Sequence, residues 1–330
     1  AVWTGVLLLA GCADDSPDAR FERYLGRLER ALDASGNKTP APDRFSLPTL
    51  PRTGQMRLEL AGSTLDALDF LALSGCAVQV TIGKRNSSLG RMASASQRLL
   101  LELEYLQLAP ACVQRLREEG RRELAELLDE TWRQKREQLP ALIFNATLGG
   151  TEYRDFWQPP ARLGDYPAAT SSGVLSALEA LNGSVRQWLD GDYRFDNLAF
   201  ELLLSEVAKG DGGALLKAEA LQASWLATTD ALLAARLQHH RDQGFIRNPN
   251  EKYVLKNVVL RFFIGDLQPW LAAVDRRRQR LLPAVRELEQ LLADALPPPY
   301  RDWQAQRDQA LTDWSGAPRR HVRCIQALRD

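Results

Sequence analysis

Apolar residues recur at helical spacing along most of the chain. Phe21, Tyr24 and Leu28 recur at intervals of three or four residues, which places them on one face of a helix. Ser16-Pro17-Asp18 in front of them combines a capping residue, a proline for the first turn and an early carboxylate. Gly36 follows the run and is a typical helix terminator. The pattern predicts a first helix between these signals.

Similar periodic segments fill the rest of the chain and predict an all-α fold. Gly265 and Pro269 interrupt one long segment, where a kink or a break is expected. The short segment Ala77–Ile82 alternates as a strand does and stays ambiguous. The expected helices are Leu65–Leu73, Ser94–Pro110, a segment ending near Gln138, Val174–Leu189, Asp196–Lys209, Ala214–Gln243, Asn250–Leu282, Ala284–Ala295, Arg301–Trp314 and Arg319–Leu328.

Two long segments lack this periodicity. Residues 39–54 contain four prolines and predict an extended connector, stiffer than a Gly/Ser linker. Residues 149–173 are rich in aromatic side chains, so we expect an ordered loop packed on the body rather than a flexible linker. We therefore predict that residues 12–55 carry the first helix and the connector, and that residues 56–330 form one compact multi-helix domain.

The apolar run Val6–Ala10 is followed by Gly11 and Cys12. An apolar core ending in small residues is typical of a secretory signal, and the cysteine directly after it resembles the lipobox of bacterial lipoproteins. The resemblance implies that residues 1–11 are a signal-peptide remnant and that Cys12 carries the lipid, palmitate included. It also implies a membrane-anchored protein that faces the periplasm. Ala13 after the cysteine favours the outer membrane. The alternative is that Cys12 is an ordinary cysteine.

Three further cysteines, Cys76, Cys112 and Cys324, allow at most one disulfide within the chain if Cys12 is lipidated. We predict a bridge between Cys76 and Cys112, because both lie at ends of predicted helices. The loop between them is long enough to run back along the intervening helix. Cys324 is then the remaining thiol, expected to be buried. Three buried free thiols are the alternative.

The segment Gly83–Arg91 combines glycines, hydroxyl groups and cations. Such a loop could hold a phosphate or a carboxylate, although it lacks the spacing of a P-loop. The candidate ligand-binding residues are Arg85, Asn86, Ser87, Ser88 and Arg91. The competing interpretation is a turn-rich connection whose cations pair with acidic neighbours.

Signals for other chemistry are weak. The 42 basic and 42 acidic residues balance, which argues against a nucleic-acid partner. Neither the three histidines nor the cysteines have the spacing of a zinc site, and serine-hydrolase motifs do not occur. We therefore expect no metal, no cofactor and no catalytic residues.

Six short motifs of the chain are Ser74-Gly75-Cys76, Arg85–Gly90, Ser96–Leu99, Ala109–Cys112, Leu260–Gly265 and Gln268-Pro269-Trp270. In combination they resemble an uncharacterised family of proteobacterial lipoproteins, domain of unknown function 3080. The resemblance extends over nearly the whole chain and implies an envelope protein without an assigned activity. We therefore expect a non-enzymatic interaction or scaffold protein with an envelope partner. The alternative is a periplasmic binder of small anions that uses Gly83–Arg91.

Overall fold

A computed structural model describes residues 15–32, 42, 46–60, 67–243 and 249–329. All regular elements in these ranges are helical, so the predicted all-α fold is confirmed. The elements are α1 (Pro17–Ala31), α2 (Thr53–Met56), α3 (Ala67–Ala72), α4 (Ala77–Asn86), α5 (Ser88–Arg91), α6 (Ala95–Glu118), α7 (Arg122–Ala146), α8 (Thr151–Phe156), α9 (Gly173–Leu189), α10 (Asn197–Ala208), α11 (Gly212–Gln243), α12 (Pro249–Val258), the π-helix η2 (Val259–Leu267), α13 (Gln268–Leu291), the 3₁₀ helix η3 (Ala293–Ala295), α14 (Pro298–Ser315) and α15 (Ala317–Arg329).

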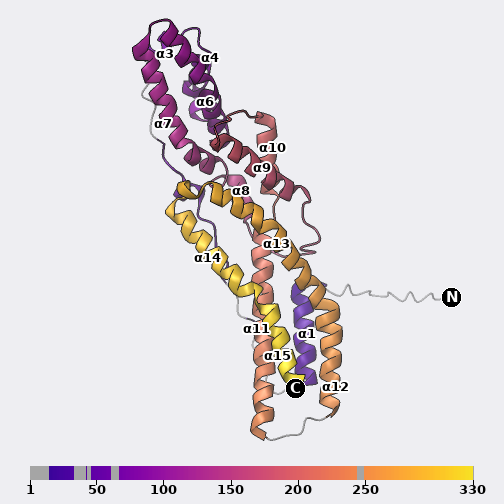
Figure 1. Ribbon diagram of the computed structural model, residues 1–330. Helices are drawn as coiled ribbons and strands as arrows, with labels where there is room; N and C mark the ends of the chain where they lie inside the picture. The colour runs from indigo at the N-terminus through magenta and orange to yellow at the C-terminus, as the bar shows by residue number, and fades with distance from the viewer. Residues whose placement is uncertain (1–14, 33–41, 43–45, 61–66, 244–248, 330) are drawn as a thin grey trace, which may run out of the picture.

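The helices lie along one long axis (Figure 1). The arm at one end contains α3, α4, α6 and α7, and the opposite end contains α1, α11, α12 and α15. Helices α8, α9, α10, α13 and α14 lie between these ends. Most buried apolar side chains form one continuous main core, which extends from Phe21 in α1 through Phe144 in α7 to Ile325 in α15.

A second, smaller cluster lies in the arm and is called the arm core here. It is formed where α4 and the start of α7 pack on α6. Its residues are Leu73, Cys76, Val78, Ile82, Tyr105, Ala109, Cys112, Val113, Leu116, Ala125 and Leu128.

Helix α1 begins as its sequence predicts. The Ser16 hydroxyl accepts a hydrogen bond from the Ala19 amide at 3.3 Å, and Pro17 occupies the first turn. The apolar face that includes Phe21 and Leu28 is buried in the main core. The first helix, grouped with the connector in the sequence analysis, thus packs as part of the main helical body.

Helices α4 and α5 correct the analysis of residues 77–91. Val78 and Ile82 are buried on one side of α4, whereas Val80 is 62% exposed, so the apparent alternation belongs to a helix. The segment Gly83–Arg91, predicted as a loop, is also helical apart from a break at Ser87. Gly90 permits the tight return, because a Cβ there would lie 2.2 Å from the Lys84 carbonyl oxygen.

Pro110 does not end its helix, contrary to the prediction, because α6 continues to Glu118. A proline inside a helix leaves the carbonyl four residues earlier without its usual amide donor. That carbonyl belongs to Leu106, and the Trp132 indole of α7 donates a hydrogen bond to it at 2.9 Å. Packing against α7 therefore supplies the bond that Pro110 cannot make. Helix α7 likewise extends past Gln138, through Pro140, to Ala146.

Residues 249–291 form a nearly continuous helical run rather than two helices with a break between them. The irregularity expected near Gly265 and Pro269 appears as the π-helix η2, after which α13 begins with Pro269 in its first turn. Pro283 lies inside α13, so the separate helix predicted from Ala284 is the second half of α13.

The aromatic segment after α7 is packed on the body, as predicted. Tyr153, Phe156, Trp157 and Tyr166 are all buried, and α8 forms its first part. Of the proline-rich connector, residue 42 and residues 46–54 are described, and residues 46–52 have no regular structure before α2. The start of the helix predicted at Leu65–Leu73 lies outside the described residues.

Candidate functional site

A cleft of about 940 Å³ lies between α4, α5, α6 and α7 on one side and residues 57–60, which follow α2, on the other. Its volume is in the range of small-molecule binding sites. Asn145 holds this segment in place, because its side-chain amide exchanges two hydrogen bonds of 2.9 Å with the backbone of Leu58. Residues 57–60 thereby become one wall of the cleft.

Three of the five predicted ligand-binding residues line this cleft: Arg85, Asn86 and Arg91. Ser87 and Ser88 are exposed and do not line it. The Ser87 hydroxyl instead accepts a hydrogen bond from the Gly90 amide at 3.0 Å and caps α5. Ser87 therefore shapes the backbone, whereas the neighbouring cations and the amide reach the cleft.

A buried charge cluster forms one part of the cleft wall. Glu102 of α6 lies between Arg85 of α4, at 2.7 Å, and Lys135 of α7, at 2.5 Å. Burial lowers the pKa of Lys135, although the adjacent Glu102 carboxylate opposes the shift. The Lys135 ammonium also lies 4.9 Å from the centre of the Tyr105 ring. Glu102 thus joins the three helices that build the cleft.

Other cations of the cleft are not neutralised in this way. Within the described ranges, Arg57, Arg91 and Arg98 have no ion pair with a carboxylate. Arg91 donates to the Asn86 carbonyl at 2.9 Å, and Arg98 donates to the Arg91 carbonyl at 2.8 Å. The charged lining residues are the basic Arg57, Arg85, Arg91, Arg98 and Lys135 and the acidic Glu59, Glu102 and Glu152. The lining therefore carries an excess of positive charge, suited to an anion.

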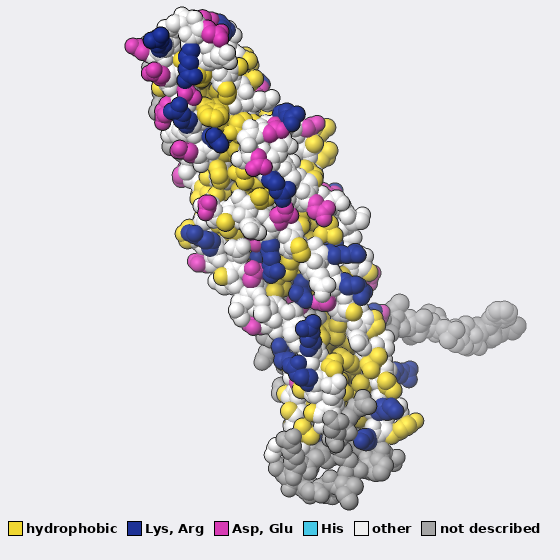
Figure 2. Space-filling model, in the orientation of Figure 1, with side chains coloured by type: hydrophobic (Ala, Val, Ile, Leu, Met, Phe, Trp, Pro, Cys, Tyr) yellow, Lys and Arg dark blue, Asp and Glu magenta, His cyan; other side chains and the backbone are white. Residues whose placement is uncertain are grey.

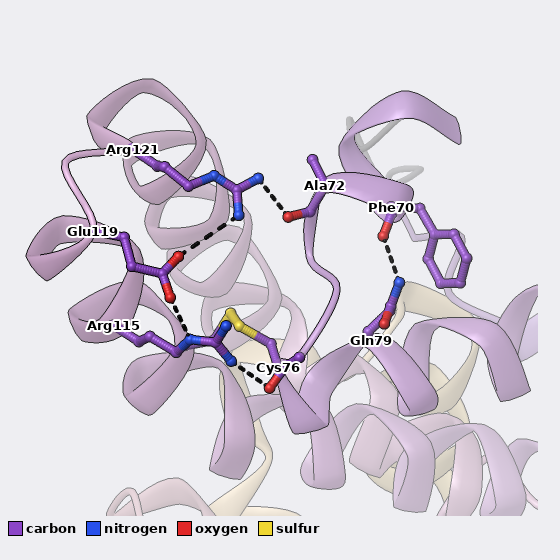
Figure 3. The surroundings of a disulfide bond; sticks show 9 residues. Phe70, Ala72, Cys76, Gln79, Arg115, Glu119 and Arg121 are labelled. Carbon is purple, nitrogen blue, oxygen red and sulfur yellow. Dashed lines mark hydrogen bonds and ion pairs between the residues drawn. A yellow bond between two sulfur atoms is a disulfide. The ribbon is translucent and has the colours of Figure 1, made fainter.

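The disulfide between Cys76 and Cys112 fixes α4 against α6 (Figure 3). This is the pairing predicted from the sequence. Arg115 donates to the Gly75 carbonyl at 2.5 Å and Arg121 to the Ala72 carbonyl at 2.5 Å, so the turn before α4 is also held by side chains of the α6–α7 hairpin. The bridge and these bonds set the position of α4, and with it the position of Arg85.

The chain matches, over residues 21–328, the family described as protein of unknown function DUF3080. It belongs to this family. Comparison with curated proteins and with solved structures finds no match. The matched residues include nearly all of α1–α15 and therefore every helix that lines the cleft.

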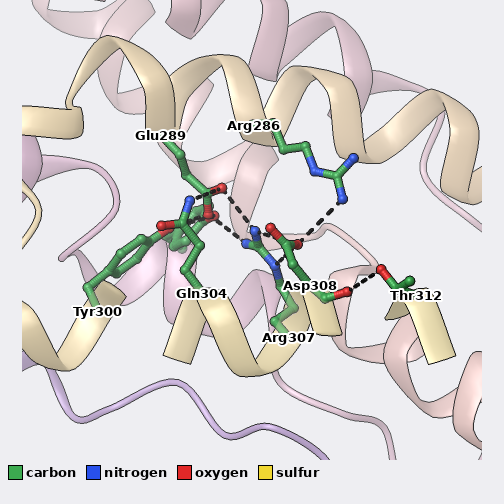
Figure 4. Close-up of polar contacts among 8 residues, drawn as sticks. Arg286, Glu289, Tyr300, Gln304, Arg307, Asp308 and Thr312 are labelled. Carbon is green, nitrogen blue, oxygen red and sulfur yellow. Dashed lines mark hydrogen bonds and ion pairs between the residues drawn. The ribbon is translucent and has the colours of Figure 1, made fainter. Parts of the chain in front are cut away.

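A second group of charged residues in this DUF3080 chain is closed to solvent (Figure 4). Arg307 of α14 makes two bonds to the Glu289 carboxylate of α13, at 2.6 and 2.9 Å. Tyr300 and Gln304 donate to the same carboxylate at 2.7 and 2.8 Å. Both charged side chains are almost fully buried, with 0% and 2% exposed. This network links helices of the main core and offers no surface to a ligand.

A third polar group lies at the opposite end from the arm. The Tyr24 hydroxyl is 2.9 Å from His321 Nε2, and His321 Nδ1 is 2.5 Å from Asp230. These three residues tie α1, α15 and α11 together. Cys324 is a free thiol, as predicted, but it is half-buried rather than buried.

No group of three or more potential metal ligands occurs in the described part of the chain. None of the described helices combines the length and apolar character needed to cross a membrane. Cys12, the predicted lipidation site, lies outside the described residues.

Proposed function

We propose that the protein is a lipid-anchored protein of the bacterial cell envelope that binds a small organic anion in the cleft. The observation that carries this proposal is a cleft of about 940 Å³ whose arginines Arg57, Arg91 and Arg98 lack carboxylate partners among the described residues. A planar guanidinium group binds a carboxylate or a phosphate through two parallel hydrogen bonds.

Apolar side chains also line the cleft, including Phe70, Ile82 and Leu101. A ligand that fills this volume therefore has an apolar part in addition to its charged group. Phosphate monoesters and carboxylates with a short carbon skeleton have this combination. The geometry thus favours anion binding, the alternative of the sequence analysis. The expected scaffold role, the envelope partner and the absence of catalysis stay predictions.

The envelope location rests on the N-terminal sequence, with Cys12 directly after Leu9-Ala10-Gly11. The Cys76–Cys112 disulfide supports the same location, because disulfides persist in oxidising compartments such as the periplasm. In cells, Cys12→Ser should abolish lipidation, so that a high-salt wash, which weakens electrostatic binding to headgroups, releases the protein from the membrane fraction. Intact-mass measurement of the purified protein tests this, and an unchanged mass would contradict it.

Calorimetric titration with inorganic phosphate and glycerol phosphate tests the cleft. The double variant Arg57→Gln/Arg98→Gln should bind glycerol phosphate at least about tenfold more weakly, because two charge-assisted contacts are lost. Its melting temperature should stay unchanged.

The matched control is Arg122→Gln/Arg301→Gln, which removes two exposed arginines outside the cleft. It should bind like the parent protein. Equal weakening in both double variants would show that only net charge matters, and the proposed site would be wrong.

A further inference from the structure

The outer side of α12 and η2 exposes apolar side chains. Tyr253 is 66% exposed, Leu260 is 48% exposed and Ile264 is 45% exposed, with Val254 beside them at 43%. Their inner neighbours, such as Phe263, are buried in the main core. These four exposed residues and the basic residues Lys252, Lys256 and Arg261 of the same two elements are called the α12–η2 face here.

The charge of this face has one sign. Between Lys252 and Gly265 the sequence contains three basic residues and no aspartate or glutamate, and all three basic side chains are exposed. Arg261 and Arg27 of α1 both lie near the Phe262 ring, at 5.6 and 5.3 Å. Figure 2 shows yellow and dark blue side chains on the right-hand side of the lower half of the molecule, where Figure 1 places α12. Faces that mix apolar, aromatic and basic residues are typical of helices that lie on a membrane surface.

The N-terminal sequence places the proposed lipid close to this face. Cys12 precedes Ser16 by four residues, which span at most about 14 Å. Ser16 caps α1, and the first turns of α1 contact η2. Arg20 lies 3.7 Å from Asp266, and the rings of Tyr24 and Phe263 are 5.7 Å apart. A lipid on Cys12 would therefore bring η2 to the bilayer surface.

We propose that the α12–η2 face lies on anionic phospholipid headgroups beside the anchor, with its apolar side chains at the acyl boundary. This inference rests on the proposed lipidation of Cys12. A second copy of the chain fits less well, because a two-fold contact through this face would bring like charges together. Anionic headgroups supply the missing negative charge.

Vesicle co-sedimentation tests the face without the lipid. The protein is the chain from residue 12 with Cys12→Ser, which contains every described residue and carries no acyl group. It should bind vesicles of phosphatidylethanolamine and phosphatidylglycerol, and binding should weaken with added salt. Leu260→Glu/Ile264→Glu should reduce the partition coefficient at least about tenfold. Lys252→Glu/Lys256→Glu, which leaves the apolar side chains in place, should also reduce it.

The matched control is Leu198→Glu/Leu202→Glu, which makes the same change at exposed leucines of α10, 70% and 60% exposed. It should bind like the parent chain. Absent vesicle binding, or equal losses in the α10 and the α12–η2 variants, would overturn the inference. So would a face variant that changes the sedimentation coefficient but not the vesicle binding, because that result indicates self-association. The mass of the native protein tests the anchor separately, so the two failures are distinguishable.

Discussion

In the main core, a charged pair is buried among aromatic rings, whereas the arm core is closed by a disulfide. Arg307 lies 5.1 Å from the Trp157 ring and 4.9 Å from the Trp303 ring, and both oxygens of Glu289 accept hydrogen bonds. The arm core is a small set of apolar residues around Cys76–Cys112. The two regions thus combine different means of stabilisation in one helical body.

The difference follows from the sizes of the two cores. A large core has enough apolar burial to offset the cost of removing two charges from water, provided that their hydrogen bonds are complete. A small core at the end of an arm buries little surface, and small structures commonly depend on covalent links. Variants in the two regions should therefore differ in how much stability they lose and in how many helices are affected.

The largest loss of stability is expected from a substitution at Arg307. Burial disfavours its charged form, but the bonds to Glu289 outweigh this and raise the pKa of Arg307 above its usual range. Arg307→Met leaves the Glu289 carboxylate buried without its cation, which should cost about 5 kcal/mol of unfolding free energy. Chemical denaturation measures this loss.

The double variant Arg307→Met/Glu289→Gln is the control. It removes both charges, so it should be more stable than Arg307→Met alone. If the double variant is less stable than the single one, the pair does not behave as a coupled unit, and the explanation given for the main core is wrong.

The disulfide should have the next largest effect. Its cysteines are 36 positions apart, and closing a ring of this length stabilises a fold by roughly 4 kcal/mol in the chain-entropy model. Cys76→Ala/Cys112→Ala should therefore lower stability by about that amount. Hydrogen exchange should increase in α4 and the adjoining part of α6, with α14 unchanged. A uniform increase over all helices would contradict a separate arm core.

The sequence predicts more about the fold than about the cleft. Periodicity identifies the longer helices where they bury one apolar face, as α1 does with Phe21 and Leu28. A residue that usually ends a helix gives a wrong prediction where a neighbouring helix supplies the missing hydrogen bond. Pro110 is an example, because the donor that replaces its missing amide is on Trp132 of another helix. Sequence spacing does not reveal such a bond.

The cleft illustrates the same limit. Arg85, Asn86 and Arg91 stand out because cations and glycines gather in one short segment. Glu102 and Lys135 lie on long helices and look like ordinary surface charges. Their burial follows only from the packing of α4 and α7 on α6, so the sequence did not identify them.

The effect of pH on stability through Glu219 should be intermediate in size. Burial raises the pKa of Glu219 from 4.5 to about 7, while Arg278, 3.1 Å away, opposes the shift. The folded protein therefore binds this proton more tightly than the unfolded chain. The resulting stability is fully present below pH 4.5 and is lost as the pH rises through about 7.

Glu219→Gln mimics the protonated side chain. At pH 8 it should be more stable than the parent protein, by up to roughly 3 kcal/mol, and the difference should vanish near pH 4. Denaturation across this pH range measures it. Glu126→Gln, an exposed change in α7, should show no such dependence. If both variants show the same pH dependence of stability relative to the parent protein, Glu219 is not the residue responsible.

The smallest effect concerns the hydrogen bond between α7 and α6 beside the arm core. Trp132→Phe keeps an aromatic ring but removes the donor to the Leu106 carbonyl, so a loss of about 1–2 kcal/mol is expected. In the Pro110→Ala background the new amide of residue 110 can donate to that carbonyl, as in any regular helix. Trp132→Phe should therefore cost measurably less there. The double-mutant cycle compares the two costs by denaturation. Equal costs in both backgrounds would show that Trp132 stabilises the arm by packing alone, and that α6 accommodates Pro110 without help from α7.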